Sequence, residues 1–370
     1  MPASRLSIKQ SLLLSVLLFL LIDLIVFRSG LYAKFLTMSS MQGFAQHISH
    51  SVNVGKFNPE NSILIVGDSR ITEGFSHQQA NLTAKKMGIE FFNAGIGGST
   101  LRTWCYLLER WDPNQDRFKA IVITLPSYRN APPADAGLNS RVLDADFLGP
   151  NITSKAYVDF LQHQEGFKNK LSITAPLLIS ASQYSKDFMD LILHPRNRIE
   201  TYKWKKATGL NFSDAYKGNP DNMVGLSYDR RANILKYPER LNADQKQAIQ
   251  NLVIKSSTTS DELLSSSKEY SRYWLTRILN RYKQSKTKII VLRMPSTPVP
   301  AINQDANFDV LIDGKHFKNE NLYIIPENTF LNLEDPKYFW DPNHLNADGR
   351  AALSNQISNT LVEYLSKKPY

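Results

Sequence analysis

The chain contains very little cysteine. Cys105 is the single cysteine among 370 residues, so the chain can form neither an intramolecular disulfide nor a cysteine-based zinc site. The residue stands in the apolar segment LRTWCYLLER, which favours a role in core packing over that of a reactive thiol. The composition therefore points away from disulfide-stapled folds, and no metal or organic cofactor is implied.

Clustered positive charge is also missing. The formal net charge is +10, but the lysines and arginines are scattered, and no nucleic-acid-binding motif is present. We therefore expect no nucleic-acid partner, and a basic surface near an anionic envelope or membrane is the more economical interpretation. Hydrophobic residues make up 42% and charged residues 21%, which is typical of a chain that folds into one large or two average domains.

One long hydrophobic run stands near the N-terminus. The segment SLLLSVLLFLLIDLIVF, residues 11–27, holds a single charge, Asp23. At the helical rise per residue it spans roughly 25 Å, enough for a bilayer core. Arg5 and Lys9 precede it and favour a cytoplasmic N-terminus. We expect residues 1–10 to be a cytoplasmic tail and the run to be a single-pass signal anchor, with the body periplasmic or at the cell surface.

Two other interpretations of the run stay open. Small residues near Gly30 and Ala33 permit a cleaved signal peptide, although no clean A-x-A site follows the run. A buried core helix is the remaining alternative.

Residues 28–60 mix polar and scattered apolar positions, and we expect a stalk there.

The body, residues 61–366, alternates strand-like and helix-like segments. Five short apolar runs are typical of buried strands: 62–67, 89–95, 120–126, 288–295 and 321–327. Helical segments are expected after Ser69, at 100–111 and 270–284, and from Asn346 as an N-cap. This alternation predicts an α/β fold, a three-layer α/β/α sandwich with a mostly parallel sheet.

Residues 131–265 interrupt that alternation. They begin with the loop-like NAPPADAGLN, and helices are plausible around 154–165, 179–193 and 242–255. The span from Asn197 to Tyr237 shows few clear elements, which makes it a candidate substrate or partner surface. We interpret the whole stretch as a large insertion into the α/β domain.

Reactive side chains follow the predicted strands. Ser69 follows the first strand, a glycine-rich turn at 95–100 follows the second, and Asp341 and His344 precede the last helix. Active sites of open α/β sheets lie at the carboxyl ends of the strands. A serine hydroxyl becomes a nucleophile when a histidine held by a carboxylate takes its proton. Backbone amides such as that of Gly98 can bind the resulting oxyanion, worth about 3 kcal/mol per donor.

These motifs, in this order, resemble the SGNH or GDSL-type hydrolases and acyltransferases. The matching blocks are Gly67-Asp68-Ser69, Asn93 to Thr100, and Asp341-Pro342-Asn343-His344. The resemblance implies Ser69 as nucleophile, His344 as base and Asp341 as its orienting partner. It also implies that the amides of Ser69 and Gly98 form part of the oxyanion hole. The residues on either side of Ser69 have simpler interpretations. Asp68 is expected to cap the turn, and Arg70 to be solvated or ion-paired, with contact to an anionic substrate as the alternative.

The third block of the family departs from its usual pattern. It usually reads Gly-x-Asn-Asp and supplies an oxyanion-hole asparagine, whereas this chain reads Leu125-Pro126-Ser127-Tyr128-Arg129-Asn130. Asn130 is the candidate donor, two places late; the alternatives are that Ser127, Tyr128 or Arg129 substitutes for it, or that this donor is absent. Similar departures occur in membrane-anchored relatives that acylate envelope polymers, such as DltD-like and alginate-acetylation proteins.

The expected activity is transfer or hydrolysis of O-acyl groups on an envelope glycan or lipid-linked polymer. A multi-spanning membrane O-acyltransferase is the expected partner. A free-standing esterase or lipase and a catalytically silent glycan-binding or scaffold protein of the same fold remain alternatives. The ordinary α/β-hydrolase pattern Gly-x-Ser-x-Gly is disfavoured, because residues 67–71 read GDSRI.

Overall fold

The computed structural model divides the chain into two compact units. One unit comprises Met1–His50 and Arg141–Gly209, and the other comprises Ser51–Ser140 and Leu210–Tyr370. We call them the helical unit and the sheet unit. The structure describes residues 7–29, 31–36, 38, 41–125, 143–148, 154–163, 166–208, 215–229, 232, 234–258, 261–297 and 321–366.

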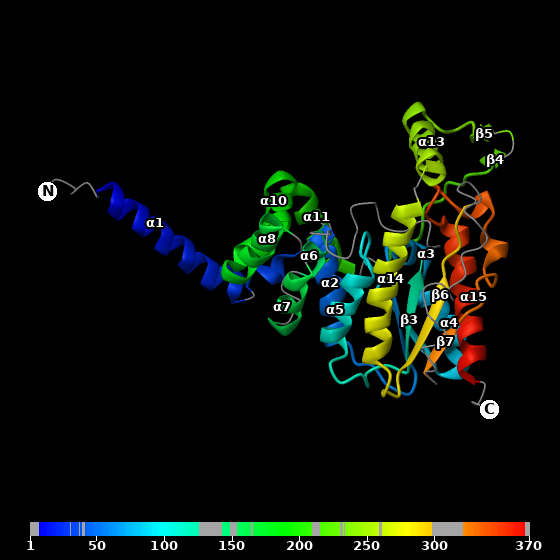
Figure 1. The fold of residues 1–370 in the computed structure, drawn as a ribbon, viewed down its shortest axis with the longest axis horizontal. Helices are drawn as coiled ribbons and strands as arrows, with labels where there is room; N and C mark the ends of the chain where they lie inside the picture. Colours follow the sequence, from blue (N-terminus) through cyan, green and yellow to red (C-terminus); the bar gives the residue numbers. More distant parts are fainter. Residues whose placement is uncertain are drawn as a thin grey trace. The chain divides into compact units, whose positions relative to one another are not determined.

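A five-stranded parallel sheet organises the sheet unit. Its order is β2-β1-β3-β6-β7, and every neighbouring pair is parallel (Figure 1). The strands are β1 (Ser62–Val66), β2 (Glu90–Asn93), β3 (Ala120–Leu125), β6 (Lys288–Arg293) and β7 (Leu322–Ile324). The predicted α/β class, the five strands and the parallel sheet are confirmed.

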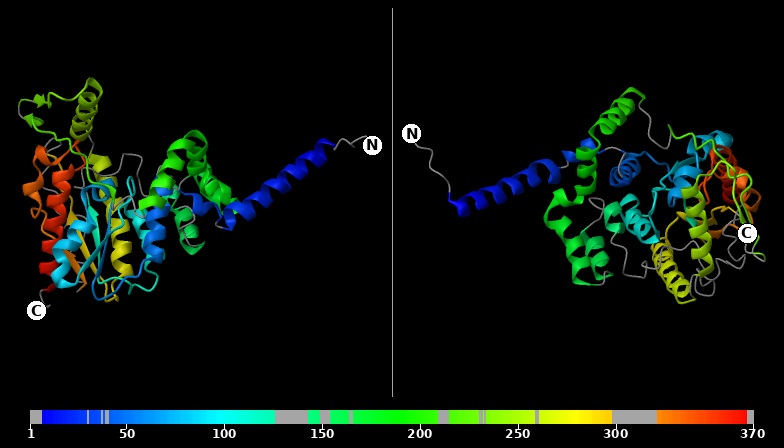
Figure 2. Two further views of the ribbon diagram at one scale, coloured as in Figure 1. Left: turned by 180° about the vertical axis from the view of Figure 1, so that it is seen from behind. Right: turned by 90° about the horizontal axis from the view of Figure 1, so that it is seen from above.

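Helices cover both faces of this sheet. Strands β1 and β3 are buried along their whole length, as expected of strands without a solvent face. Helices α4 (His77–Ala84) and α15 (Ala347–Ser366) cover one face. Helices α5 (Leu101–Trp111) and α14 (Asp261–Arg281) cover the other (Figures 1 and 2). The side chain of Asn346 accepts a hydrogen bond from Gly349 N at 2.9 Å, so α15 begins at the predicted N-cap.

The sheet unit also contains one longer helix, α13 (Ala243–Thr258), and several short elements. The short elements are α3 (Ser69–Gly74), the antiparallel strands β4 (Ser227–Asp229) and β5 (Ile234–Lys236), and 3₁₀ turns at Lys85–Met87, Leu331–Leu333 and Pro336–Tyr338. Helix α2 (Met41–Val54), of which Met41–His50 belongs to the helical unit, lies within the stretch predicted as a stalk.

The helical unit contains one helix that could cross a membrane. Helix α1 (Ile8–Ile22) continues through a π-helical stretch (Asp23–Arg28), and these 21 residues are strongly apolar and almost wholly exposed. This helix is long and apolar enough to span a bilayer. The unit also contains a 3₁₀ helix (Tyr32–Phe35), most of α2, and the helices α6 (Leu143–Leu148), α7 (Ser154–Gln162), α8 (Phe167–Leu178), α9 (Ser180–Gln183), α10 (Ser185–Leu193) and α11 (Pro195–Thr208).

The expectation of few elements between Asn197 and Tyr237 is wrong. Helix α11 occupies the first third of that span, and the β4–β5 pair lies near its end. The sequence of α11, PRNRIETYKWKKAT, is mostly charged and polar and has no regular apolar stripe, so its periodicity gave no signal. The two strands have three residues each, which is too short for an alternating pattern.

Candidate active site

The turn after β1 explains why this strand ends in glycine. A Cβ atom on Gly67 would overlap the side chains of Thr124, on neighbouring β3, and Ile71. Thr124 Oγ1 also donates a hydrogen bond to Val66 O at 3.0 Å, which fixes it in that place. The backbone must therefore pass without a side chain before Ser69 opens helix α3.

Asp68 has a structural role at this turn. Its side chain accepts a hydrogen bond from Arg70 N at 2.9 Å and so caps α3. Its other oxygen forms an ion pair of 3.1 Å with Arg70 Nη2, and both side chains are mostly buried. The expected cap and the expected ion-paired state of Arg70 are both present.

The loop before α15 holds a histidine in line with Ser69. Asp341 Oδ1 accepts hydrogen bonds from the backbone N–H groups of Asn343 and His344, each at 2.7 Å. Asp341 Oδ2 lies 2.8 Å from His344 Nδ1, and His344 Nε2 lies 2.8 Å from Ser69 Oγ. A carboxylate only accepts hydrogen bonds, so Nδ1 carries the proton and, in the neutral ring, Nε2 accepts the hydroxyl proton of Ser69. The structure thus brings together the three side chains that the motifs singled out.

The surroundings of His344 raise its pKa above the ordinary histidine value. Burial alone lowers this pKa, but the hydrogen bond and the charge of Asp341 outweigh burial, and the charge of Glu73 adds to them. Arg70 acts in the opposite direction. These surroundings therefore stabilise the imidazolium form of His344.

The glycine-rich turn after β2 lies against Ser69. A Cβ atom on Gly97 would be 3.7 Å from Ser69 Cβ, and Gly98 adopts a left-handed backbone with φ of 75°. Ile96 N donates to Gly67 O at 2.9 Å, which ties the turn to the end of β1. Within the described residues, the backbone N–H groups of Ser69 and Gly98 have no hydrogen-bond acceptor. Backbone donors at and near a serine hydroxyl suit the binding of an oxyanion.

The other predicted donors of the oxyanion hole cannot be placed. Asn130 and its substitutes Ser127, Tyr128 and Arg129 lie outside the described residues. Asn93, in the second block, is structural, because its side chain donates to Ile71 O and Phe75 O and accepts from Gly95 N.

Three further residues surround His344 without having been predicted. The ring of Trp340 stacks on the imidazole, with centroids 5.7 Å apart and planes at 18°. Trp340 Nε1 and Tyr216 Oη both donate to Glu73 Oε2 at 3.3 Å. Burial, followed by the charge of Glu73, raises the pKa of Tyr216 to about 12, so its hydroxyl remains a donor. Glu73 lies one helical turn after Ser69, which was the signal available in the sequence.

Arg350 closes this group from helix α15. It donates to the backbone oxygens of Thr72 and Glu73, and its guanidinium lies over the ring of Tyr216 at 5.1 Å. Burial lowers the pKa of Arg350 to about 10, with Tyr216 and Glu73 opposing the decrease.

Among the described residues, no group of three or more His, Cys, Asp or Glu side chains is placed to hold a metal ion.

Comparison with known proteins gives no relative from which a role could be transferred. No protein-family model matches the chain, and a search of curated proteins finds no match.

Proposed function

We propose that this chain is a membrane-anchored serine esterase or O-acyltransferase of the SGNH type. The observation that carries the proposal is the continuous hydrogen-bonded line from Asp341 through His344 to Ser69, with 2.8 Å at each side of the imidazole. The strand order and the motif blocks support it, because they put this line at the carboxyl end of β1 beside a glycine turn.

The geometry suits acyl transfer in two steps. His344 Nε2 takes the proton of Ser69 Oγ as this oxygen attacks an ester carbonyl, and the N–H groups of Ser69 and Gly98 bind the oxyanion. The intermediate collapses when the alkoxy leaving group departs with the proton from His344, leaving an acyl-Ser69 ester. An acceptor hydroxyl, or water, then loses its proton to His344 and attacks that ester, which releases the product and restores Ser69.

The proposed substrates are O-acyl groups on an envelope glycan or a lipid-linked polymer outside the cytoplasm. The apolar helix Ile8–Arg28 supports this setting, since it would tether the sheet unit to a bilayer. Arg5 and Lys9 before it favour a cytoplasmic N-terminus. A multi-spanning membrane O-acyltransferase is the partner that such a tethered enzyme would serve.

The test uses the full-length protein in detergent with p-nitrophenyl acetate and a fluorophosphonate probe. We expect turnover and labelling in the wild type and neither in Ser69→Ala. Ser76→Ala is the matched control, because Ser76 also stands at the start of a helix, as the cap of α4, but the structure shows no histidine contact for it among the described residues. Ser76→Ala should keep its labelling and lose about 0.5–2 kcal/mol of stability. Absence of labelling in folded wild-type protein would leave the silent scaffold as the better assignment.

A further inference from the structure

Helix α10 has a reversed polarity. Its inward face carries two carboxylates, with Asp187 fully buried and Asp190 half-buried. Its outward face is apolar, and four side chains on it are between 40% and 64% exposed: Phe188, Met189, Ile192 and Leu193. The spacing of these residues puts all four on one side of the helix, opposite the carboxylates. A helix on a water-exposed surface shows the opposite arrangement.

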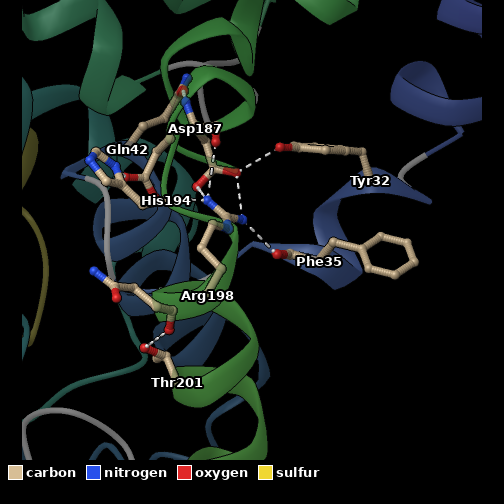
Figure 3. A network of polar contacts seen from close by, with 9 residues as sticks. Tyr32, Phe35, Gln42, Asp187, His194, Arg198 and Thr201 are labelled. Carbon is tan, nitrogen blue, oxygen red and sulfur yellow. Dashed lines mark hydrogen bonds and ion pairs between the residues drawn. The ribbon is translucent and has the colours of Figure 1, made fainter. Parts of the chain in front are cut away.

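The inward face is satisfied by a dense polar network. Arg198 pairs with both oxygens of Asp187 at 2.9 Å, and Tyr32 Oη donates to Asp187 Oδ2 at 2.8 Å (Figure 3). Arg198 Nη2 also donates to Phe35 O at 2.8 Å, and Nη1 reaches Asp190 Oδ2 at 3.2 Å. Burial opposes the charge of Arg198, but Asp187 raises its pKa above the ordinary value. The network fixes which face of α10 points inward, so the apolar face must point outward.

The exposed apolar surface extends beyond α10 and is accompanied by cations. Ile199 and Tyr202 of α11 and Phe167 and Leu171 of α8 are also more than half exposed. Apart from Arg198, which is buried and paired with Asp187, the sequence of α11, PRNRIETYKWKKAT, holds four lysines and arginines and one glutamate. Exposed apolar and aromatic residues together with excess positive charge are typical of helices that lie on an anionic lipid surface.

The apolar surface adjoins the end of the candidate membrane span. The ring of Phe188, on the outward face of α10, contacts the ring of Phe27 at 6.2 Å between centroids. Phe27 also packs against Tyr184 at 5.9 Å. Asp23, the one charge of the apolar run, is buried here and accepts a hydrogen bond from Ala181 N. Figure 1 shows α1 running outward from these helices. A span that crosses a bilayer would therefore bring α10 to the bilayer surface.

We propose that helices α8, α10 and α11 form a membrane-resting platform, with the apolar face of α10 inserted among the lipid headgroups and upper acyl chains. The proposal rests on the membrane anchor proposed above and is independent of the catalytic role. The occupant is lipid, because the platform begins at the end of the span, its exposed side is apolar and its charge suits anionic headgroups. The platform would hold the helical unit against the membrane.

The test measures membrane depth with nitroxide labels on the full-length protein. Ile192→Cys and, separately, Leu193→Cys are labelled and reconstituted at low density in vesicles of phosphatidylglycerol and phosphatidylethanolamine. Cys105 is buried, so wild-type protein treated with the same nitroxide reagent serves as the blank for labelling at Cys105. Collisions with oxygen, which concentrates in lipid, are compared with collisions with a water-soluble nickel chelate. Leu17→Cys in α1 is the reference for lipid, and Leu82→Cys, at an exposed leucine of α4, is the reference for water.

We expect the ratio of oxygen to nickel collisions at positions 192 and 193 to exceed that at position 82 several-fold. A ratio equal to that at position 82, with a lipid-like value at position 17, would overturn the platform and leave the anchor intact. A water-like value at position 17 would overturn both. Shielding of positions 192 and 193 from both reagents would also overturn it, since this result would show that protein, such as a second copy of the chain, covers the face.

Discussion

The same chemical pair, a carboxylate hydrogen-bonded to a cation-forming side chain, occurs in both units with opposite accessibility. In the sheet unit, the side chains of His344 and Asp341 remain 19% and 27% exposed at the strand ends. In the helical unit, those of Arg198 and Asp187 are 2% and 0% exposed. The first pair can meet a substrate and exchange protons, and the second pair can do neither. The geometry of such a pair alone therefore does not show whether the pair can react, because reaction also requires that a substrate can reach it.

The surroundings of the two pairs differ in the same sense. Around the sheet, apolar side chains lie inside and the polar groups gather where the strands end, as in a protein surrounded by water. In α10 the carboxylates lie inside and Phe188, Ile192 and Leu193 face out. Reversed polarity of this kind is stable when the medium outside is apolar.

The largest expected effect tests whether the two carboxylates have different roles. Asp341→Asn keeps the shape of the side chain but removes the charge that holds His344 Nδ1–H. We expect kcat/KM for p-nitrophenyl acetate to fall by roughly 10³–10⁴-fold. Asp187→Asn is the matched control in the helical unit and should leave kcat/KM near the wild-type value. Equal losses in the two variants would break the comparison.

The next largest effect is on stability, and here the larger loss of unfolding free energy is expected in the helical unit. Arg198→Met leaves Asp187 buried without its charge partner, which should cost roughly 3–5 kcal/mol of unfolding free energy. Lys337→Met is the control, because the ion pair of Lys337 with Asp335 is about half exposed and is worth about 0–1 kcal/mol. Chemical denaturation of the full chain in detergent, followed by circular dichroism, measures both.

A double variant sharpens the assignment of that cost. Asp187→Leu together with Arg198→Met removes both charges from the buried network, so most of the lost stability should return. If the double variant is as unstable as Arg198→Met alone, the cost comes from lost packing or from the bonds to Tyr32 and Phe35 O, and the charge explanation fails.

The sequence predicted the sheet well because its signal is local. Each strand is a short run of apolar residues, and Ser69, Asp341 and His344 stand in recognisable motifs at the strand ends. Glu73 and Tyr216 carry no motif, and their place beside His344 depends on contacts between segments 143 residues apart. Such contacts cannot be inferred from local pattern.

The helical unit shows a different limit of sequence reasoning. The apolar stripe of α10 is visible in SKDFMDLIL, but a stripe defines two faces without saying which one is inside. The usual rule would have buried Phe188 and Ile192 and exposed Asp187. The pairing of Asp187 with Arg198 across two helices decides the matter, and no periodicity encodes it.

A smaller effect concerns the glycine turn of the sheet unit. Gly98→Ala and Gly88→Ala each force a residue with a Cβ into a left-handed backbone, with φ of 75° and 65°, so each should cost about 1–2 kcal/mol of stability. Gly98 follows Gly97, which lies against Ser69, so displacing the N–H of Gly98 should lower kcat by up to about 10²-fold, whereas a Cβ atom at Gly88 would meet nothing within 4 Å. Comparing kcat with unfolding free energy for both variants separates strain from oxyanion binding. A loss of kcat in Gly88→Ala of the same size would remove the special role of Gly98.

The smallest expected effect is a shift in the pH dependence of activity. It tests whether the pKa of His344 responds to the charge of Glu73, to which His344 has no hydrogen bond within the described residues. A general base acts when neutral, so activity is lost as the pH falls through the pKa of His344. Burial lowers this pKa, while Asp341 and then Glu73 raise it, with a net increase. Glu73→Gln removes one of the two stabilising negative charges but keeps an acceptor for Trp340 and Tyr216. The acid limb of kcat/KM should therefore move to lower pH. Glu90→Gln, at an exposed position of β2, should leave the limb in place. If the acid limb does not move in Glu73→Gln, the charge of Glu73 is screened from His344. The pair of His344 and Asp341 would then differ from the pair of Arg198 and Asp187 only in its exposure to solvent.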